Sequence, residues 1–409
     1  MEIDYNSGRG KAGIVLDLVI IILNSGFALT VGSSSTMIIV NAVYLLFSFV
    51  LHPKIKYQKR KSNFLILFLI LMIATFVFNL DFGSAMEYLR IVELAFLAFY
   101  ISCNYSNEEL IKGYCMFMRV DAAISCAFYL LFTYASGISF PEFTNPSGIS
   151  YYTCILGNIN TSVLGSEFIR NSGVFWEGGM YAAFVAIWII FEIQNSQRNK
   201  LSIAAIILGL YTIYTTKSTS GYLYIILLLF LFIIHSTNGK RRLWQDIMLF
   251  LGLFVVIYAG SKMNDIIVSL SKTNASVFGK LIYKNASYTD RLYGPAADFI
   301  VCLKNPFGVG TGNVTEMVDA TSQQIFGTGL TSRTSTLTYF FATFGFLSGI
   351  LVNYQWIRYF VLEVQQNADK IIIIALFVLL CSSTPLNSNL IFWIILFCGA
   401  GVEKYGTVK

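Results

Sequence analysis

Residues 63–80 read NFLILFLILMIATFVFNL and contain no charged side chain. An α-helix that crosses a bilayer needs about 20 predominantly apolar residues, so this stretch predicts a transmembrane helix. The whole chain has the same character, because 56% of its 409 residues are hydrophobic and only 12% are charged. Soluble domains carry about 25% charged residues. The composition therefore excludes an ordinary soluble protein and predicts an all-α polytopic membrane protein.

Other apolar segments flank this stretch on both sides, and together they predict about 12 transmembrane helices. The predicted spans are 12–30, 35–51, 63–80, 88–102, 113–135, 178–193, 201–216, 220–235, 246–260, 335–353, 371–384 and 390–402. A long polar insert, 261–334, separates spans 9 and 10, and a smaller polar connector covers 136–177. We expect 1–409 to form a single transmembrane domain with one large extracytoplasmic loop that contains short helices.

The most basic short connector, residues 52–61, sets the predicted orientation. It holds four lysines and one arginine, and short loops rich in Lys and Arg stay in the cytoplasm. If the spans alternate, both termini are cytoplasmic and the two long polar connectors face outward. The net charge of +6 mostly reflects this bias, so it does not indicate nucleic-acid binding. Cys154 and Cys302 both fall in outward connectors, which leaves a disulfide between them open.

The first candidate site is the segment RNSGVFWEGG, residues 170–179, at the start of the sixth span. Arg170 and Glu177 lie close together among glycines that allow a ligand near the backbone, which suits an anionic substrate and a proton acceptor. A simpler interpretation is that Glu177 stabilises a helix N-terminus. That interpretation explains Glu177 but leaves Arg170 unexplained.

The second candidate site is DRLYGPAADFIVCLKNPFGVGTGN, residues 290–313. Pro295 predicts the first turn of a short helix that Asn305-Pro306 ends, with Arg291 just ahead of the helix N-terminus, where phosphate binds well. The glycine run that includes Gly308 and Gly310 lacks the Gly-Lys-Ser/Thr ending of a phosphate loop and follows a helix. It therefore does not indicate a nucleotide site.

A third group, Glu87, Arg90 and Glu93, occupies one predicted helix face at the outer start of the fourth span. Two interpretations stay open: an internal salt bridge that neutralises Arg90, or binding of an anionic lipid headgroup by Arg90. No zinc pattern or Asp-x-Asp motif occurs, and the chain has only two histidines. We therefore expect neither a metal site nor a cofactor.

Four segments together resemble the O-antigen polymerase and O-antigen ligase superfamily, which are glycosyltransferases of the GT-C type. Residues 170–179 resemble the pattern Arg-x-x-Gly-x-Phe-x-Glu-Pro/Gly of Wzy-type polymerases. The segment STSG at 218–221 resembles a Ser-Arg-Gly motif, with Ser220 where arginine is common. Residues 291–312 and 335–349 resemble the loop and the span that follows it. Ligases carry a His-Asn pair before the position of Gly345, and this chain has Thr334-Ser335 there, which favours a polymerase.

The resemblance implies a polymerase of O-antigen, capsule or exopolysaccharide repeat units in the bacterial inner (plasma) membrane. An undecaprenyl-pyrophosphate-linked oligosaccharide would be the donor and a second lipid-linked repeat unit the acceptor, both at the outer face. The implied partners also include membrane lipid and a chain-length regulator protein. The candidate catalytic residues are Glu177, Arg170 and Arg291, and the candidate substrate-binding residues are Arg90, Arg333, Tyr293, Gly308 and Gly310.

Two alternatives stay open at this stage. A ligase would transfer a finished glycan to another acceptor. A non-enzymatic flippase or transporter would typically contain repeated halves and broken helices near the membrane midplane. The sequence indicates neither feature, and the best arginine candidates gather near the predicted outer face.

Overall fold

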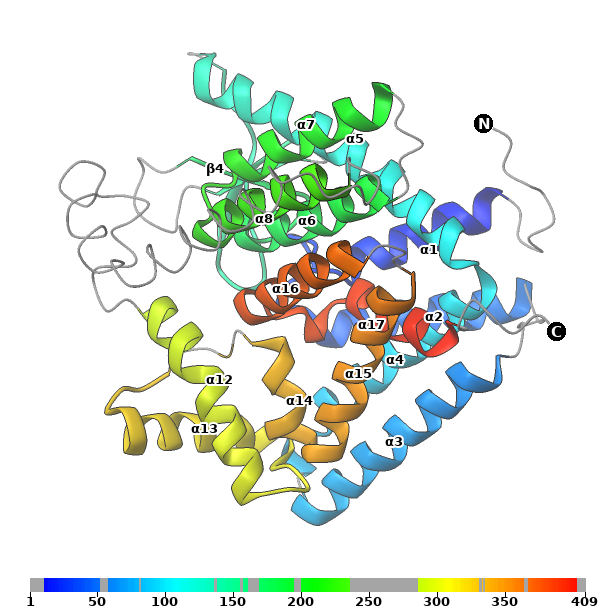
Figure 1. Cartoon of the computed structure of the whole chain (residues 1–409), viewed down its shortest axis with the longest axis vertical. Helices are drawn as coiled ribbons and strands as arrows, with labels where there is room; N and C mark the ends of the chain where they lie inside the picture. The colour runs from blue at the N-terminus through cyan, green and yellow to red at the C-terminus, as the bar shows by residue number, and fades with distance from the viewer. Residues whose placement is uncertain are drawn as a thin grey trace.

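The computed structural model describes residues 11–51, 58–80, 82–135, 138–154, 157–160, 169–194, 200–235, 286–330, 333, 335–363 and 367–402. This part of the chain is mostly helical and contains 14 α-helices (Figure 1). The helices are α1 (Lys11–Leu23), α2 (Ser34–Leu51), α3 (Lys59–Asn79), α4 (Ala85–Asn104), α5 (Asn107–Tyr134), α6 (Gly178–Gln194), α7 (Lys200–Thr215), α8 (Thr219–His235), α12 (Ala286–Lys304), α13 (Gly310–Phe326), α14 (Thr336–Phe344), α15 (Phe346–Glu363), α16 (Asn367–Ser383) and α17 (Leu390–Gly401). The all-α expectation is confirmed at this level.

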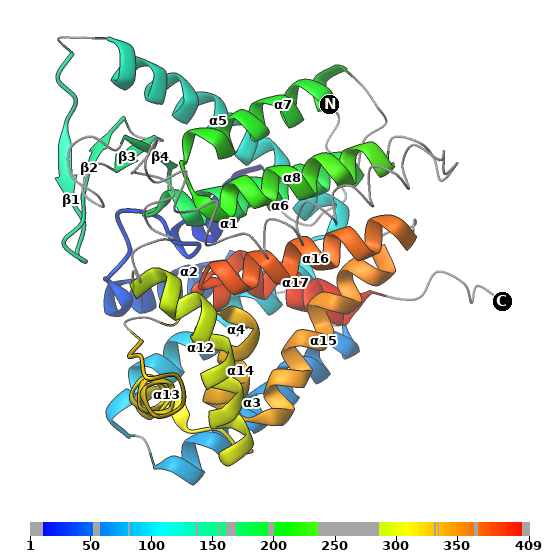
Figure 2. The same ribbon diagram turned by 60° about the vertical axis from the view of Figure 1, so that its left-hand side comes forward.

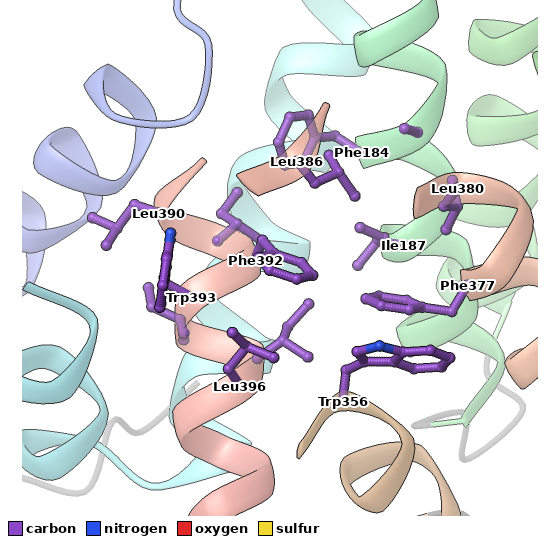
Figure 3. Packing of buried hydrophobic residues seen from close by; sticks show 14 of the residues in the cluster. Phe184, Ile187, Trp356, Phe377, Leu380, Leu386, Leu390, Phe392, Trp393 and Leu396 are labelled. Atoms are coloured by element: carbon purple, nitrogen blue, oxygen red, sulfur yellow. The ribbon is translucent and has the colours of Figure 1, made fainter. Parts of the chain in front are cut away.

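The centre of the bundle is built on α6 and α17, which are mostly apolar and buried on every side. Every residue of α6 from Gly178 to Ile193 is buried, and so is every residue of α17 from Leu390 to Ala400. A helix that is hydrophobic all round belongs in the core of a large bundle. Figure 3 shows Phe392 of α17 facing Phe377 of α16, which packs on Trp356 of α15 with ring centroids 4.7 Å apart.

The outer helices present apolar side chains outward instead of burying them. On α3, Ile66, Ile70, Ile73 and Val77 share one face and are each 55–58% exposed. Within the described residues, α3 and α5 are long and apolar enough to cross a membrane, and α2, α6, α7, α8 and α17 contain shorter apolar stretches. A large exposed apolar surface marks contact with a partner or a membrane, so these helices support membrane association.

Each predicted span except the ninth coincides with a described helix, and the ninth, 246–260, lies outside the described residues. Two spans need correction. The first helix ends at Leu23, and residue Phe27 pairs with Phe175 in an isolated antiparallel bridge. The span predicted at 335–353 is broken at Gly345 into α14 and α15, so the chain does contain a broken helix.

The connector 136–177 contains a feature that the sequence did not predict. Four short strands, β1 (Glu142–Thr144), β2 (Ser150–Thr153), β3 (Asn158–Asn160) and β4 (Arg170–Gly173), form an antiparallel sheet in the order β1-β2-β3-β4. In Figure 2 this sheet and α13 lie toward the same side of the bundle. Cys154 in this connector and Cys302 in α12 are free cysteines.

The described part of the insert folds as α12 and α13, beside α14. Pro295 lies inside α12, which begins at Ala286, so the prediction that Pro295 starts the helix is wrong. Arg291 consequently belongs to the helix and does not precede its N-terminus. The predicted end is confirmed, because α12 stops at Lys304, just before Asn305-Pro306.

Two glycines allow the turn after α12 to pack closely against the break between α14 and α15. Gly308 and Gly345 have φ of +81° and +88°, a conformation that side chains with a Cβ rarely adopt. A Cβ on Gly308 would overlap Thr343 O, and one on Gly345 would overlap Pro306 O. The amide of Phe346 donates to Pro306 O at 2.8 Å, which closes the contact. Gly308, the first glycine of the run in the insert, is thus required by backbone packing.

We predict that Gly308→Ala lowers the stability of the purified protein by about 1 to 3 kcal/mol more than Gly327→Ala, the usual cost of overpacking. Gly327 also has positive φ, at +68°, but nothing lies within 4 Å of its Cβ position. The Gly327→Ala variant therefore measures only the cost of placing a Cβ on a residue with positive φ, without any steric overlap. Thermal unfolding in detergent measures the difference, and equal melting temperatures for the two variants would contradict the proposed close packing.

Candidate functional site

The segment between β4 and α6 is held in place on both sides. The amide of Ala28 donates to Val174 O at 3.0 Å, and that of Trp176 donates to Gly26 O at 3.1 Å. From the sheet, Tyr151 Oη donates to Trp176 O at 2.6 Å. These bonds fix the backbone immediately before Glu177, which is half-buried. The backbone that leads into Glu177 is therefore held by two other parts of the chain, residues 26–28 and Tyr151 of the sheet.

Arg170 is the most buried cation of this region, with 4% of its surface exposed. Its Nε donates to Thr216 O at 3.0 Å, at the end of α7. Burial lowers the pKa of Arg170, and the adjacent Glu177 opposes that lowering. A Cβ on Gly178 would lie 3.0 Å from Thr216 O and 3.5 Å from Arg170 Nη2. Gly178 thus allows close packing against the backbone at Thr216, whereas the expectation was close approach of a ligand.

Lys217 is a cation at the same place that the sequence analysis missed. It follows Thr216 in the turn between α7 and α8 and has φ of +48°, an uncommon conformation for a residue with a long side chain. Burial and the nearby charge of Arg170 both lower its pKa. The sequence signal that could have identified it is its position just before the STSG segment. Strained residues of this kind concentrate at functional sites.

Arg291 of α12 lies near this group, although it is more than a hundred residues from Arg170 in the sequence. It is close enough to Arg170 for its charge to add to the lowering of the Arg170 pKa. The Nε of Arg291 is buried and has no hydrogen-bond partner among the described residues. Pro295 has no N–H, so the carbonyl of Arg291 also lacks its usual helical donor. A buried guanidinium donor without a partner is costly, and a bound anion would satisfy it.

The structure therefore brings the three predicted catalytic residues into one electrostatic cluster. We call Arg170, Glu177, Lys217 and Arg291 the cation cluster. Its three cations and one carboxylate leave a net charge of about +2 at neutral pH. The Glu177 charge also contributes to raising the pKa of Tyr151, after the larger effect of burial. Such a cluster can hold a doubly charged anion while Glu177 accepts a proton.

The predicted substrate-binding arginines lie elsewhere and are already paired. Arg90 donates to Glu93 Oε2 at 2.7 Å and to Asn24 Oδ1 at 2.6 Å. Of the two interpretations left open for Arg90, the structure contains the internal salt bridge, with Glu93 as the partner. Arg333 donates twice to Asp298 Oδ1, at 2.7 and 3.1 Å. Burial raises the pKa of Asp298, and Arg333 opposes the rise.

The other predicted substrate-binding residues also have structural contacts. Tyr293 stacks on Phe326 with ring centroids 4.8 Å apart, which joins α12 to α13. Gly308 packs against the break at Gly345, and Gly310, with φ of +81°, begins α13. In the part of the chain that the structure describes, no group of three or more His, Cys, Asp or Glu side chains could hold a metal ion.

No protein-family model, curated protein or solved structure matches this chain. The functional argument therefore depends on the cation cluster and on the sequence motifs that form it.

We predict that Arg333→Gln lowers stability by about 3 to 5 kcal/mol, because it leaves the Asp298 carboxylate buried without its cation. The double variant Arg333→Gln/Asp298→Asn should recover part of this loss. As a control, Lys112→Gln breaks an exposed pair with Glu108, in which the side chains are 58% and 69% exposed. It should cost less than about 1 kcal/mol. Chemical denaturation of the wild type, the three variants above and Asp298→Asn alone would measure the coupling. Additive effects of the two single substitutions would contradict it.

Proposed function

We propose that this protein is a polysaccharide polymerase that joins O-antigen, capsule or exopolysaccharide repeat units. The donor is an undecaprenyl-pyrophosphate-linked oligosaccharide, and the acceptor is a second lipid-linked unit. The observation that carries the proposal is the meeting of Arg170 and Arg291 beside Glu177, with the buried Nε of Arg291 left without a partner. The motif resemblance and the membrane-type helices support the same class of reaction.

The cation cluster suits the leaving group of this reaction. When the glycosidic bond to the lipid pyrophosphate breaks, the bonding electron pair stays on the phosphate oxygen, and the negative charge there increases. Fixed cations that are already desolvated stabilise such charge more strongly than water does. A guanidinium group can also donate two parallel hydrogen bonds to phosphate oxygens, and this bidentate binding suits Arg170 and Arg291. Lys217 adds a third, more compact charge.

Glu177 is the proposed general base. The acceptor hydroxyl attacks the anomeric carbon of the donor sugar, forms the new glycosidic bond and loses its proton to the Glu177 carboxylate. Among the described residues, the Glu177 carboxylate accepts no hydrogen bond from another side chain, and the backbone just before it is held by Gly26 and Tyr151. A carboxylate oxygen beside the phosphate site can accept the proton of the acceptor hydroxyl.

We further propose that the cation cluster faces outward from the bacterial inner membrane and that both termini are cytoplasmic. The basic segment at Lys59–Lys61 begins α3, and Arg60 donates to Val402 O at the end of α17. The cluster instead lies where α7 ends and where α6 and α8 begin. In Figure 2 these two ends lie on opposite sides of the bundle. The arrangement supports a substrate that is used after it crosses the membrane.

The broken helix at Gly345 is a feature that is also typical of transporters. Unwound helices in transporters offer free backbone groups to cargo. At this break, however, Phe346 N donates to Pro306 O, and Thr75 Oγ1 donates to Phe344 O at 3.3 Å. These backbone groups are satisfied by protein, so the break supports packing of the insert and does not favour transport.

We predict that Arg291→Gln and Glu177→Gln each reduce elongation by about 100-fold, the usual cost of losing one oxyanion-type donor or a general base. The measurement is the length distribution of glycans made by purified protein from lipid-linked repeat units. Lys304→Gln is the matched control, because Lys304 is an exposed cation on the same helix, and it should leave chain length unchanged. Long glycans from the Arg291 variant would refute the role of the cluster.

We also predict the orientation. Alkaline phosphatase folds only outside the cytoplasm, so an insertion after Gly148, in the exposed turn between β1 and β2, should be active. An insertion after Ser106, between α4 and α5, should be inactive. Cell-surface activity assays with equal expression would test this prediction. The reverse pattern would place the cation cluster in the cytoplasm and exclude an outer-face polymerase.

A further inference from the structure

The outward side of α12 is apolar, although the insert that contains this helix is polar in sequence. Leu292, Phe299 and Leu303 are 41–64% exposed, and Ala296 between them is exposed as well. These four residues are spaced i, i+4, i+7 and i+11, so they form a line about 16 Å long on one side of the helix. We call these four residues the α12 stripe. A continuous line of this kind differs from the single exposed apolar residues that occur on any protein surface.

The charged side chains of α12 lie mainly on its other sides. Asp290 and Asp298 are 1% and 2% exposed, and Asp298 pairs with Arg333. Arg291 is half-buried, and Lys304 at the end of α12 is the one exposed charged residue of this helix. The carboxylates thus face protein while large apolar side chains face outward. Water would favour the reverse arrangement, so the stripe indicates an apolar medium beside it.

The stripe continues onto helices of the apolar bundle. Phe307, in the turn after α12, is 60% exposed and stacks on Phe78 of α3 with ring centroids 5.0 Å apart. Phe299 of the stripe contacts Phe341 of α14, with ring centroids 6.0 Å apart. Phe78 is itself 67% exposed, and α3 is long and apolar enough to cross a membrane. The stripe is therefore continuous with the exposed apolar surface of a candidate membrane-spanning helix.

The direction of α12 indicates how it meets a bilayer. In Figures 1 and 2, α12 runs steeply across the direction of α8 and α16. A helix that crosses the direction of the apolar bundle helices lies along a bilayer surface and does not pass through it. With one apolar side, such a helix has the form of an interfacial amphipathic helix.

We propose that the α12 stripe lies in the membrane interface, in the lipid leaflet on the side of the cation cluster. The partner is the leaflet itself: the stripe enters the acyl chains by about 5 to 10 Å, and Lys304 extends to the phosphates. Arg291 precedes Leu292, so it is held near the level of the lipid headgroups. The inserted segment is thus supported by the membrane and is not a loop surrounded by water. The inference does not depend on the proposed glycosyl transfer.

Photolabelling of the wild-type protein tests the proposal. Full-length protein is placed in nanodiscs of phosphatidylcholine that carries a diazirine near the glycerol end of one acyl chain, and labelled peptides are mapped by mass spectrometry. The α12 peptide with Leu303 should be labelled at least about tenfold more than the α13 peptide with Glu316, because large apolar side chains favour burial in lipid. Glu316 is also exposed, so exposure alone is matched. Equal labelling of the two peptides would overturn the proposal.

A second experiment distinguishes lipid from a second copy of the chain. Replacing Leu303 by p-benzoylphenylalanine keeps a large apolar side chain at an exposed position, so folding should be retained. Irradiation in nanodiscs should add the mass of one lipid to the protein, whereas the same group in place of Glu316 should not. A covalent dimer, or no lipid adduct, at position 303 would overturn the proposal. Both experiments measure lipid contact and not elongation, so their failure is distinct from failure of the proposed function.

Discussion

Burial of the Arg170 guanidinium is the constraint on which the candidate site depends. A charged group that is 4% exposed costs several kcal/mol unless it is paired and hydrogen-bonded. Thr216 O and the charge of Glu177 supply that compensation. To supply it, the strand β4, the end of α7 and the start of α6 must meet at one point. The small sheet and the bonds from residues 26–28 then hold this meeting point in register.

The insert carries Arg291 to the site, and backbone contacts far from Arg291 hold the insert in position. The turn after α12 packs on the break between α14 and α15. Gly308 and Gly345 meet there so closely that neither position has room for a Cβ. Asp298 adds a second attachment, because it accepts hydrogen bonds from Arg333 and from Thr338 Oγ1 at 2.6 Å. Residues that resembled ligand contacts in the sequence, such as Gly308 and Arg333, therefore act first as supports. They hold the helix that carries Arg291.

The sequence predicted those aspects of the structure that depend on composition and local pattern. Apolar segments gave the positions of most helices, and the charges at 170, 177 and 291 were expected to act together, as the structure now places them. The break at Gly345 was missed because Phe344 and Phe346 keep the segment apolar on either side. The salt bridge between Arg90 and Glu93 was one of the two interpretations that the sequence left open. The location of Pro295 inside a helix, the Asn24 partner of Arg90 and the Asp298 partner of Arg333 were missed because they depend on the fold. Lys217 was missed because its positive φ and its proximity to Arg170 are visible only in the structure, although its position just before the STSG segment was a signal.

The attachment of α12 at one end has a mechanical consequence. Arg291 and Lys304 are 13 positions apart in this helix, which corresponds to an arm of about 20 Å at 1.5 Å per residue. With the glycine contact acting as a pivot, a tilt of about 5° would move the Arg291 backbone by nearly 2 Å. That displacement is comparable to the margin between a direct hydrogen bond and a lost one. Small changes in how the pivot packs would thus be magnified at the guanidinium.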